Sequence, residues 1–129
     1  RFEYTGEIGP GDATLVAVQG ENVWVAGGSS VWVGGRDLET FFPIFQAPQS
    51  ISLLVAASGV AVVAAAGDYV AALVTQGSQV LSAGVVAAPA ALGSRSGFGS
   101  AVAVVAGAVV VGAPLRSSVL VFHLQAGEW

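Results

Sequence analysis

Short apolar runs separated by glycine-containing turns recur along most of the chain. The most regular example lies near the C-terminus, where the runs are Ser100–Val105, Val109–Ala113 and Val119–Leu124. Runs of about four to eight residues that are rich in valine favour strands over helices, because branched side chains pack well on a pleated surface. The spacing of the runs and the turns between them predict an all-β chain built from antiparallel meanders.

The runs are apolar at nearly every position and do not alternate with polar residues. A sheet with one solvated face shows a period of two, whereas a sheet covered on both faces gives continuous apolar runs. A blade of a β-propeller is covered in this way by its two neighbours. The Ala, Gly and Val of 60–66 and 101–113 also suit strands that crowd together near a propeller axis.

Two upstream segments repeat the C-terminal plan. Gly20, Gly59 and Gly107 stand in the first turn of successive copies, at offsets of 39 and 48 residues. Four-stranded units with a period of about 40 to 50 residues are typical of propeller blades. The expected strands are 13–18, 23–26, 31–35 and 41–48 in the first copy, and 51–57, 60–66, 69–74 and 80–89 in the second.

These repeats predict a β-propeller segment of about three four-stranded blades. Residues 1–12 are an N-terminal arm or closing strand, and the blade-like repeats are 13–48, 49–91 and 92–129. A closed propeller typically has about four to eight blades, so we expect an incomplete ring that is completed by other polypeptide. Because the chain begins with arginine and not methionine, we expect a processed piece or a segment of a larger protein.

The composition supports a covered surface and excludes several functions. Only 9% of the residues are charged, against roughly 25% in ordinary soluble domains, so partners are expected to cover much of the surface. A net charge of −4 with four arginines and no lysine excludes a nucleic-acid-binding face. The absence of cysteine excludes disulfides and thiolate metal sites.

A multi-span membrane protein is a second fold that the hydrophobicity suggests. The segment Ile51–Val74 is nearly uncharged, but Ser58-Gly59 and Gly67-Asp68 interrupt it, and no cluster of Lys or Arg flanks it. A spanning helix needs about 20 apolar residues. The propeller explains the same hydrophobicity without a membrane, so a membrane span is disfavoured.

Aromatic residues in the first copy are candidates for an interaction surface. A three-residue loop at 27–29 would place Trp24 opposite Trp32 as a cross-strand pair, used for packing or, as the alternative, for stacking on a sugar. Phe41, Phe42 and Phe45 lie in an expected strand that Pro43 marks as an edge, and they form an inter-unit packing cluster or a patch for a partner. The candidate interaction surface comprises Trp24, Trp32, Phe41, Phe42, Phe45 and Trp129.

The stretch from Phe98 to Trp129 resembles the FG-GAP repeat, the blade repeat that integrin alpha subunits also carry. The repeat-motif residues are Phe98, Gly99, Gly112, Ala113 and Pro114. In the upstream copies Gly27-Gly28 and Ala65-Ala66-Gly67 take the place of the second half of the motif, and no Phe-Gly precedes them. The resemblance implies a propeller, adhesion-type protein contacts and an extracellular or cell-surface location.

The calcium loop of many FG-GAP repeats is missing. Its place is taken by Val105–Ala108, which has no side-chain oxygen, whereas calcium takes about six to eight oxygen ligands. We therefore expect no metal and no cofactor. His123, the only histidine, is expected on the strand face opposite Phe122, with no catalytic role.

The sequence thus predicts a non-catalytic structural or protein-interaction subunit of a larger assembly. Its partners are other proteins or further blades, and a carbohydrate ligand stays a possibility without support. The chain could instead be a fragment of an enzyme whose active site is formed with missing parts, or the multi-span membrane protein described above.

Overall fold

The computed structural model describes Glu3 and residues 13–34, 41–65, 68–76, 79–89 and 96–123, which form three antiparallel sheets in chain order. The first sheet contains β1 (Leu15–Gln19), β2 (Asn22–Gly27), β3 (Ser30–Gly34) and β4 (Phe41–Gln46). The second contains β5 (Ile51–Ala57), β6 (Val60–Ala65), β7 (Tyr69–Gln76) and β8 (Gln79–Val85). The third contains β9 (Ala101–Val105), β10 (Ala108–Ala113) and β11 (Ser118–His123), with the 3-10 helix η2 (Pro114–Arg116) before β11.

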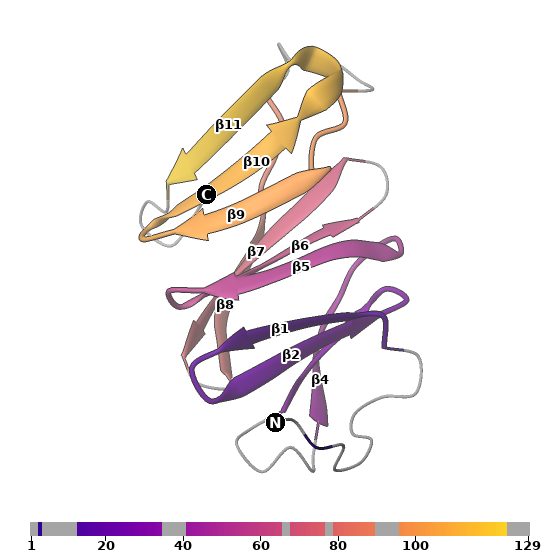
Figure 1. Cartoon of the computed structure of the whole chain (residues 1–129), viewed down its shortest axis with the longest axis vertical. Helices are drawn as coiled ribbons and strands as arrows, with labels where there is room; N and C mark the ends of the chain where they lie inside the picture. Colours follow the sequence, from indigo (N-terminus) through magenta and orange to yellow (C-terminus); the bar gives the residue numbers. More distant parts are fainter. Residues whose placement is uncertain are drawn as a thin grey trace.

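Each sheet is a meander in which consecutive strands are neighbours. The sheets stack one on another along the long axis of the molecule, and the first strand of the second sheet, β5, lies against both β1 and β9 (Figure 1). This is the arrangement of successive propeller blades. The predicted all-β propeller segment is confirmed, and in the described part the row of sheets does not close into a ring.

Tight turns join the first two strands of each sheet. In the second sheet the turn is Ser58-Gly59, with φ angles of 52° and 78°. Two successive positive φ angles define the hairpin turn whose twist matches that of the flanking strands. Glycine at the second position makes this turn accessible at little steric cost.

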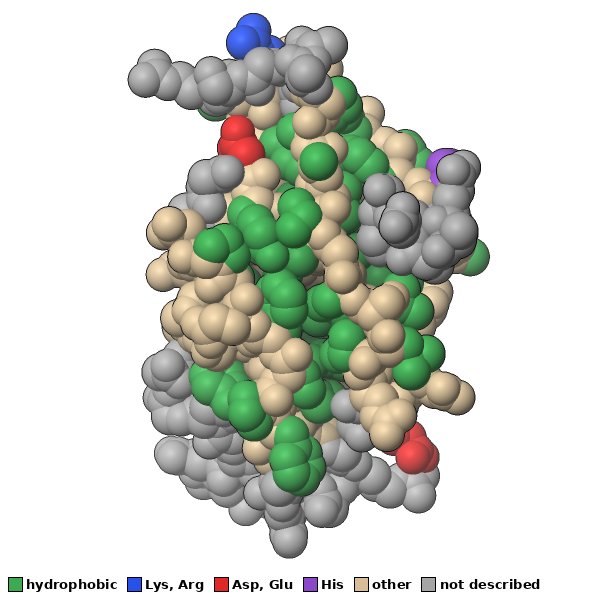
Figure 2. All heavy atoms as spheres, turned by 180° about the vertical axis from the view of Figure 1, so that it is seen from behind, with side chains coloured by type: hydrophobic (Ala, Val, Ile, Leu, Met, Phe, Trp, Pro, Cys, Tyr) green, Lys and Arg blue, Asp and Glu red, His purple; other side chains and the backbone are tan. Residues whose placement is uncertain are grey.

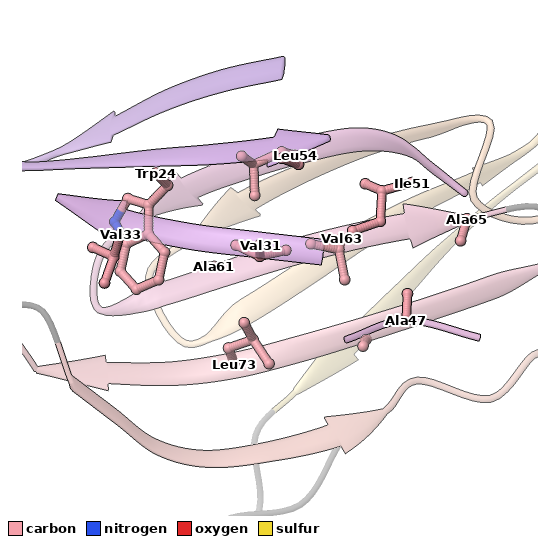
Figure 3. Packing of buried hydrophobic residues seen from close by; sticks show 12 residues of the cluster. Trp24, Val31, Val33, Ala47, Ile51, Leu54, Ala61, Val63, Ala65 and Leu73 are labelled. Atoms are coloured by element: carbon pink, nitrogen blue, oxygen red, sulfur yellow. The ribbon is translucent and has the colours of Figure 1, made fainter. Parts of the chain in front are cut away.

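Two apolar layers hold the three sheets together. The first lies between the first and second sheets and contains Trp24, Val31, Val33, Leu54, Ala61, Val63 and Leu73 (Figure 3). The second lies between the second and third sheets and contains Val62, Val70, Val86, Phe98, Val109 and Val111. The middle sheet contributes to both layers, and every residue of β6 is therefore buried. For the middle sheet this confirms the inference that continuous apolar runs mark sheets covered on both faces, whereas the apolar runs β9 and β11 belong to a sheet that the described residues cover on one face only.

The predicted pairing of Trp24 with Trp32 is wrong. The turn after β2 holds two residues, not three, so Gly27 pairs with Ser30. Trp24 then lies opposite Val33, and Trp32 lies opposite Val25. A shift of one residue moves a side chain to the other face of a sheet, and the two tryptophans accordingly lie on opposite faces.

The remaining strand predictions hold with small changes at the ends. β4 and β8 end before the predicted boundaries because the chain leaves the sheet edge, and Val86 enters the second apolar layer. Pro43 lies on the edge strand β4, as expected.

Residues 51–74, weighed as a membrane helix, form β5, β6 and most of β7. No helix in the part of the chain that the structure describes is long and apolar enough to cross a membrane. The predicted N-terminal arm lies outside the described residues apart from Glu3.

Candidate interaction surface

Each sheet has a forward face, toward the sheet that follows in the chain, and a backward face, toward the sheet that precedes it. Trp24 lies on the forward face of the first sheet, and Val62 occupies the equivalent position in the second. Both are fully buried by the next sheet. Counted from the first turn of each sheet, the equivalent residue of the third sheet is Val110.

The forward face of the third sheet is apolar and is exposed along the outer strands β9 and β11, while on the central strand Ala108 is buried and Val110 is partly buried. The strand register arranges it in three rows, Ala101–Gly112–Val119, Ala103–Val110–Val121 and Val105–Ala108–His123. Val105, Val119 and Val121 are exposed by 55%, 70% and 55%. No other segment among the described residues packs on this face.

A shallow hollow of about 390 Å³ lies beside this face. The residues that line it include Ala101, Gly112, Pro114, Ser118 and Val119. The hollow exists because the row carries no large side chain, whereas the equivalent row of the first sheet is Leu15–Ala26–Val31.

The backward face of the first sheet is also apolar and lies at the other end of the stack. Val16 and Val18 are exposed by 67% and 63%, while Val25 is buried and Trp32 is partly buried. On the face that Figure 2 shows, hydrophobic side chains reach the surface over much of the described part, with few charged side chains among them.

The two halves of the Phe-Gly and Gly-Ala-Pro motif meet at the start of the third sheet. The Gly99 N–H donates to the Gly112 carbonyl at 3.1 Å. The Leu115 N–H donates to the Ser96 carbonyl at 3.0 Å, and a Cβ at Gly97 would lie 3.1 Å from Cδ of Pro114. The motif is therefore one local unit, although its halves are separated in the sequence.

The same loop joins the third sheet to the second. Phe98 is 3% exposed and lies in the second apolar layer, edge-on to Phe122 with ring centroids 5.9 Å apart. Gly99 has a φ of +91°, and a Cβ there would lie 3.0 Å from Cγ2 of Val70. Glycine is therefore required at this position both for its backbone conformation and for the close approach of the sheets.

A polar contact between the first two sheets was not anticipated from the sequence. The Gln19 amide oxygen accepts from the Gly59 N–H, and its Nε2 donates to Thr75 Oγ1 at 3.3 Å. The Thr75 N–H in turn donates to the Gly59 carbonyl at 2.8 Å. Gln19 thus ties the end of β1 to a turn and a strand of the next sheet. The one sequence feature that could have indicated this contact is the position of Gln19 as the last residue of an otherwise apolar strand.

The structure separates the predicted aromatic cluster. The prediction that Trp24 belongs to a surface is wrong, because its side chain is fully buried. Its Nε1 has no acceptor among the described residues. Phe45 is partly buried against the first layer, and Phe42 is 59% exposed. The Phe41 ring lies over Gly34, where a Cβ would be 2.7 Å from Cε1 of the ring. Trp129 lies outside the described residues.

Ionisable side chains do not gather in the described part of the chain. Within it, no three His, Cys, Asp or Glu side chains lie close enough to hold a metal ion. His123 is exposed on the forward face of the third sheet and Phe122 packs on the opposite face, as predicted. Burial raises the pKa of the Tyr69 phenol above its ordinary value of 10.0, because the charged form is desolvated.

Comparison with known proteins places the fold. No family model and no curated protein matches this sequence. Among solved structures, the N-terminal domain of Nup159 is similar, with 18% identity, a TM-score of 0.60, and coverage of 91% of this chain and 29% of that one. That domain is a β-propeller. At this identity the likeness shows the fold alone, and the chain spans less than a third of the domain that it matches. Sheet order, stacking and this likeness together show a segment of a β-propeller.

Proposed function

We propose that this chain is a non-catalytic β-propeller module that serves as a structural or protein–protein interaction subunit, with its ring completed by other polypeptide. One observation carries the proposal. The exposed forward face of the third sheet is equivalent, position by position, to two faces that the chain buries against a following sheet.

The energetics favour a covered face. Burial of apolar surface contributes about 25 cal/mol per Å², and contiguous exposed apolar patches on soluble proteins typically mark interaction sites. Val119 and Val121 lie on adjacent rows of the third sheet, and Val105 extends the surface to the third row. A partner blade would cover all three rows, as the third sheet covers the second.

The proposal includes three blades over 13–48, 49–91 and 92–129, and kinship with FG-GAP repeats. The hydrogen bond between Gly99 and Gly112 supports the kinship, since it links the two halves of the motif that carries the resemblance. An extracellular or cell-surface site and adhesion-type contacts follow from that kinship. Accessibility of the chain to protease added to intact source cells tests this location.

No observation in the described part of the chain favours an enzyme. An acid–base pair requires groups within hydrogen-bond reach of one reacting atom, and no hydrogen bond or ion pair joins the described side chains of His123, Asp68 and Arg116. The paired tryptophans considered as a stacking platform for a carbohydrate are not formed, because Trp24 is inside the core and Trp32 is on the opposite face.

Site-specific photocrosslinking tests the module. A photoreactive residue at Val121 and one at Val105 are each expected to form an adduct, and the two adducts should contain one and the same partner polypeptide. The substitution Val119→Lys is expected to abolish both adducts. Leu81, which is 58% exposed on β8, is the matched control position and should give no such adduct. Adducts with lipid alone, or none from any of the forward-face positions, would refute the proposal.

A further inference from the structure

We propose that the polypeptide covering the forward face of the third sheet is the first strand of a following blade, which runs parallel to β9 and inserts a large apolar side chain into the hollow at Ala101 and Gly112. This inference rests on the proposed function, because it gives the orientation and the side-chain chemistry of the partner of the same surface.

The first strand of a following sheet docks in one orientation. β5 packs against β1 and β2, and β9 packs against β5 and β6. The N–H of Ile51, the first residue of β5, donates to the Gly28 carbonyl at 2.7 Å, just after β2 ends. Gly59, just after β5 ends, bonds to Gln19 at the end of β1, so β5 runs parallel to β1 (Figure 1). A strand that follows the third sheet in the same way starts beside Gly112 and runs parallel to β9.

The row of side chains under this starting point is smaller in the third sheet than in the other two. Ile51 lies in the layer that covers the row of the first sheet, and Gly99 approaches the row of the second, where its Cβ would lie 3.0 Å from Cγ2 of Val70. Protein interiors leave few voids larger than a water molecule, so a side chain of leucine size or larger is expected over the third row. The three rows are Leu15–Ala26–Val31, Leu53–Ala64–Val70 and Ala101–Gly112–Val119.

The packing of the chain itself does not require glycine at position 112. Gly112 has no positive φ, and a Cβ there would make only ordinary contacts, the nearest at 3.6 Å from Ala101. Gly99 differs, because it has a φ of +91° and a crowded Cβ position. Glycine within a strand weakens it and often marks a place where another group approaches closely. We therefore attribute the missing side chain at Gly112 to the incoming residue.

The lining of the hollow favours an apolar group. Ala101, Pro114 and Val119 present carbon atoms to it, and no Asp, Glu, Lys or Arg is among the described residues that line it. The hydroxyls of Ser100 and Ser118 already donate to backbone carbonyls two or three residues before them. A charged or polar side chain would lose its hydration here without gaining a donor or acceptor in return. An aliphatic or aromatic side chain has no such cost.

Photocrosslinking with located adducts tests the orientation and the chemistry together. Aliphatic diazirine residues replace Val119, which lines the hollow, and Val105, at the far end of β9, in the full chain within its source cells. Mass spectrometry then identifies the residue joined to each position. Position 119 should join a leucine, isoleucine, methionine or aromatic residue at the start of a strand. Position 105 should join a residue further along the same segment, as Gly59 follows Ile51 in the second sheet.

Filling the hollow tests whether a side chain occupies it. Gly112→Val should lower the yield of the adduct at position 119 at least about tenfold, because the new side chain overpacks the contact. Gly112→Ala, whose Cβ meets only ordinary contacts in the chain, is a milder second variant and should lower the yield by a smaller factor. Gly84→Val, on the exposed strand β8, is the matched control and should not change it. Circular dichroism matching the unaltered chain shows that each variant is folded.

Three results would overturn the inference. They are adducts in the reverse order along the partner, a small or charged residue joined at position 119, and an adduct yield that neither substitution at Gly112 changes. In each case the forward face is still covered, so the proposed function would stand. Absence of adducts from both positions in the unaltered chain would refute the proposed function, and the inference with it.

Discussion

Replacing Gln19 with alanine removes the amide that ties the first sheet to the second. The Gly59 N–H loses its acceptor, and Thr75 Oγ1 loses a donor 3.3 Å away. An intramolecular hydrogen bond contributes about 1 kcal/mol net, and a buried group left without a partner costs about 1–3 kcal/mol. Thr75 is 8% exposed, whereas Gly59 is only partly buried and water can replace part of its lost bond. We therefore expect a loss of about 1.5–2 kcal/mol in the free energy of unfolding.

The matched control is Gln46→Ala. Gln46 also makes two side-chain hydrogen bonds, to Ser29 and Ser30, but both are exposed and lie within the first sheet. Exposed substitutions of this kind change stability by about 0.5 kcal/mol or less. Urea unfolding followed by circular dichroism gives both values, and the slope of the transition should not change. Equal destabilisation by the two substitutions would show that the contact between sheets has no energetic role, and our reasoning would be refuted.

Further predictions concern the packing between sheets, and each is checked by urea unfolding in dilute solution. Gly107→Ala should lower the free energy of unfolding by about 1 kcal/mol, because φ is +72° there, although the new Cβ would meet no neighbour. Gly99→Ala should lower it by at least about 1 kcal/mol more, because its Cβ would also meet Val70. Equal losses would contradict the close approach of the sheets at Gly99. Val62→Ala should cost about 2 kcal/mol, because the side chain is fully buried, and a value as small as that of an exposed position would contradict this packing. Since the pKa of Tyr69 is raised in the folded state, the free energy of unfolding should fall as pH rises above 10.0, and Tyr69→Phe should lessen that fall; an unchanged pH profile would count against desolvation of the phenol.

The class of fold could be predicted from the sequence because it depends on local chemistry. Valine-rich runs of strand length, broken by Gly20, Gly59 and Gly107, specify hairpins wherever they occur. The absence of alternation indicated sheets covered on both faces, and β6, buried along its whole length, confirms this for the middle sheet, while β9 and β11 are exposed at alternate residues. The Phe-Gly and Gly-Ala-Pro motif marked the segment that proves to join two sheets, although the sequence did not reveal its contact with Val70.

The location of the candidate surface was decided by tertiary structure. A turn one residue shorter than predicted moved Trp24 into the core and Trp32 to the other face, because register determines which face each side chain occupies. Nor could composition distinguish Val62 from Val121, since both are valines in apolar strands. Only the order in which the sheets stack leaves one of them buried and the other exposed by 55%. The sequence by itself determined strands and turns, which follow from neighbours along the chain, whereas the interaction surface depends on which sheet has no neighbour in space.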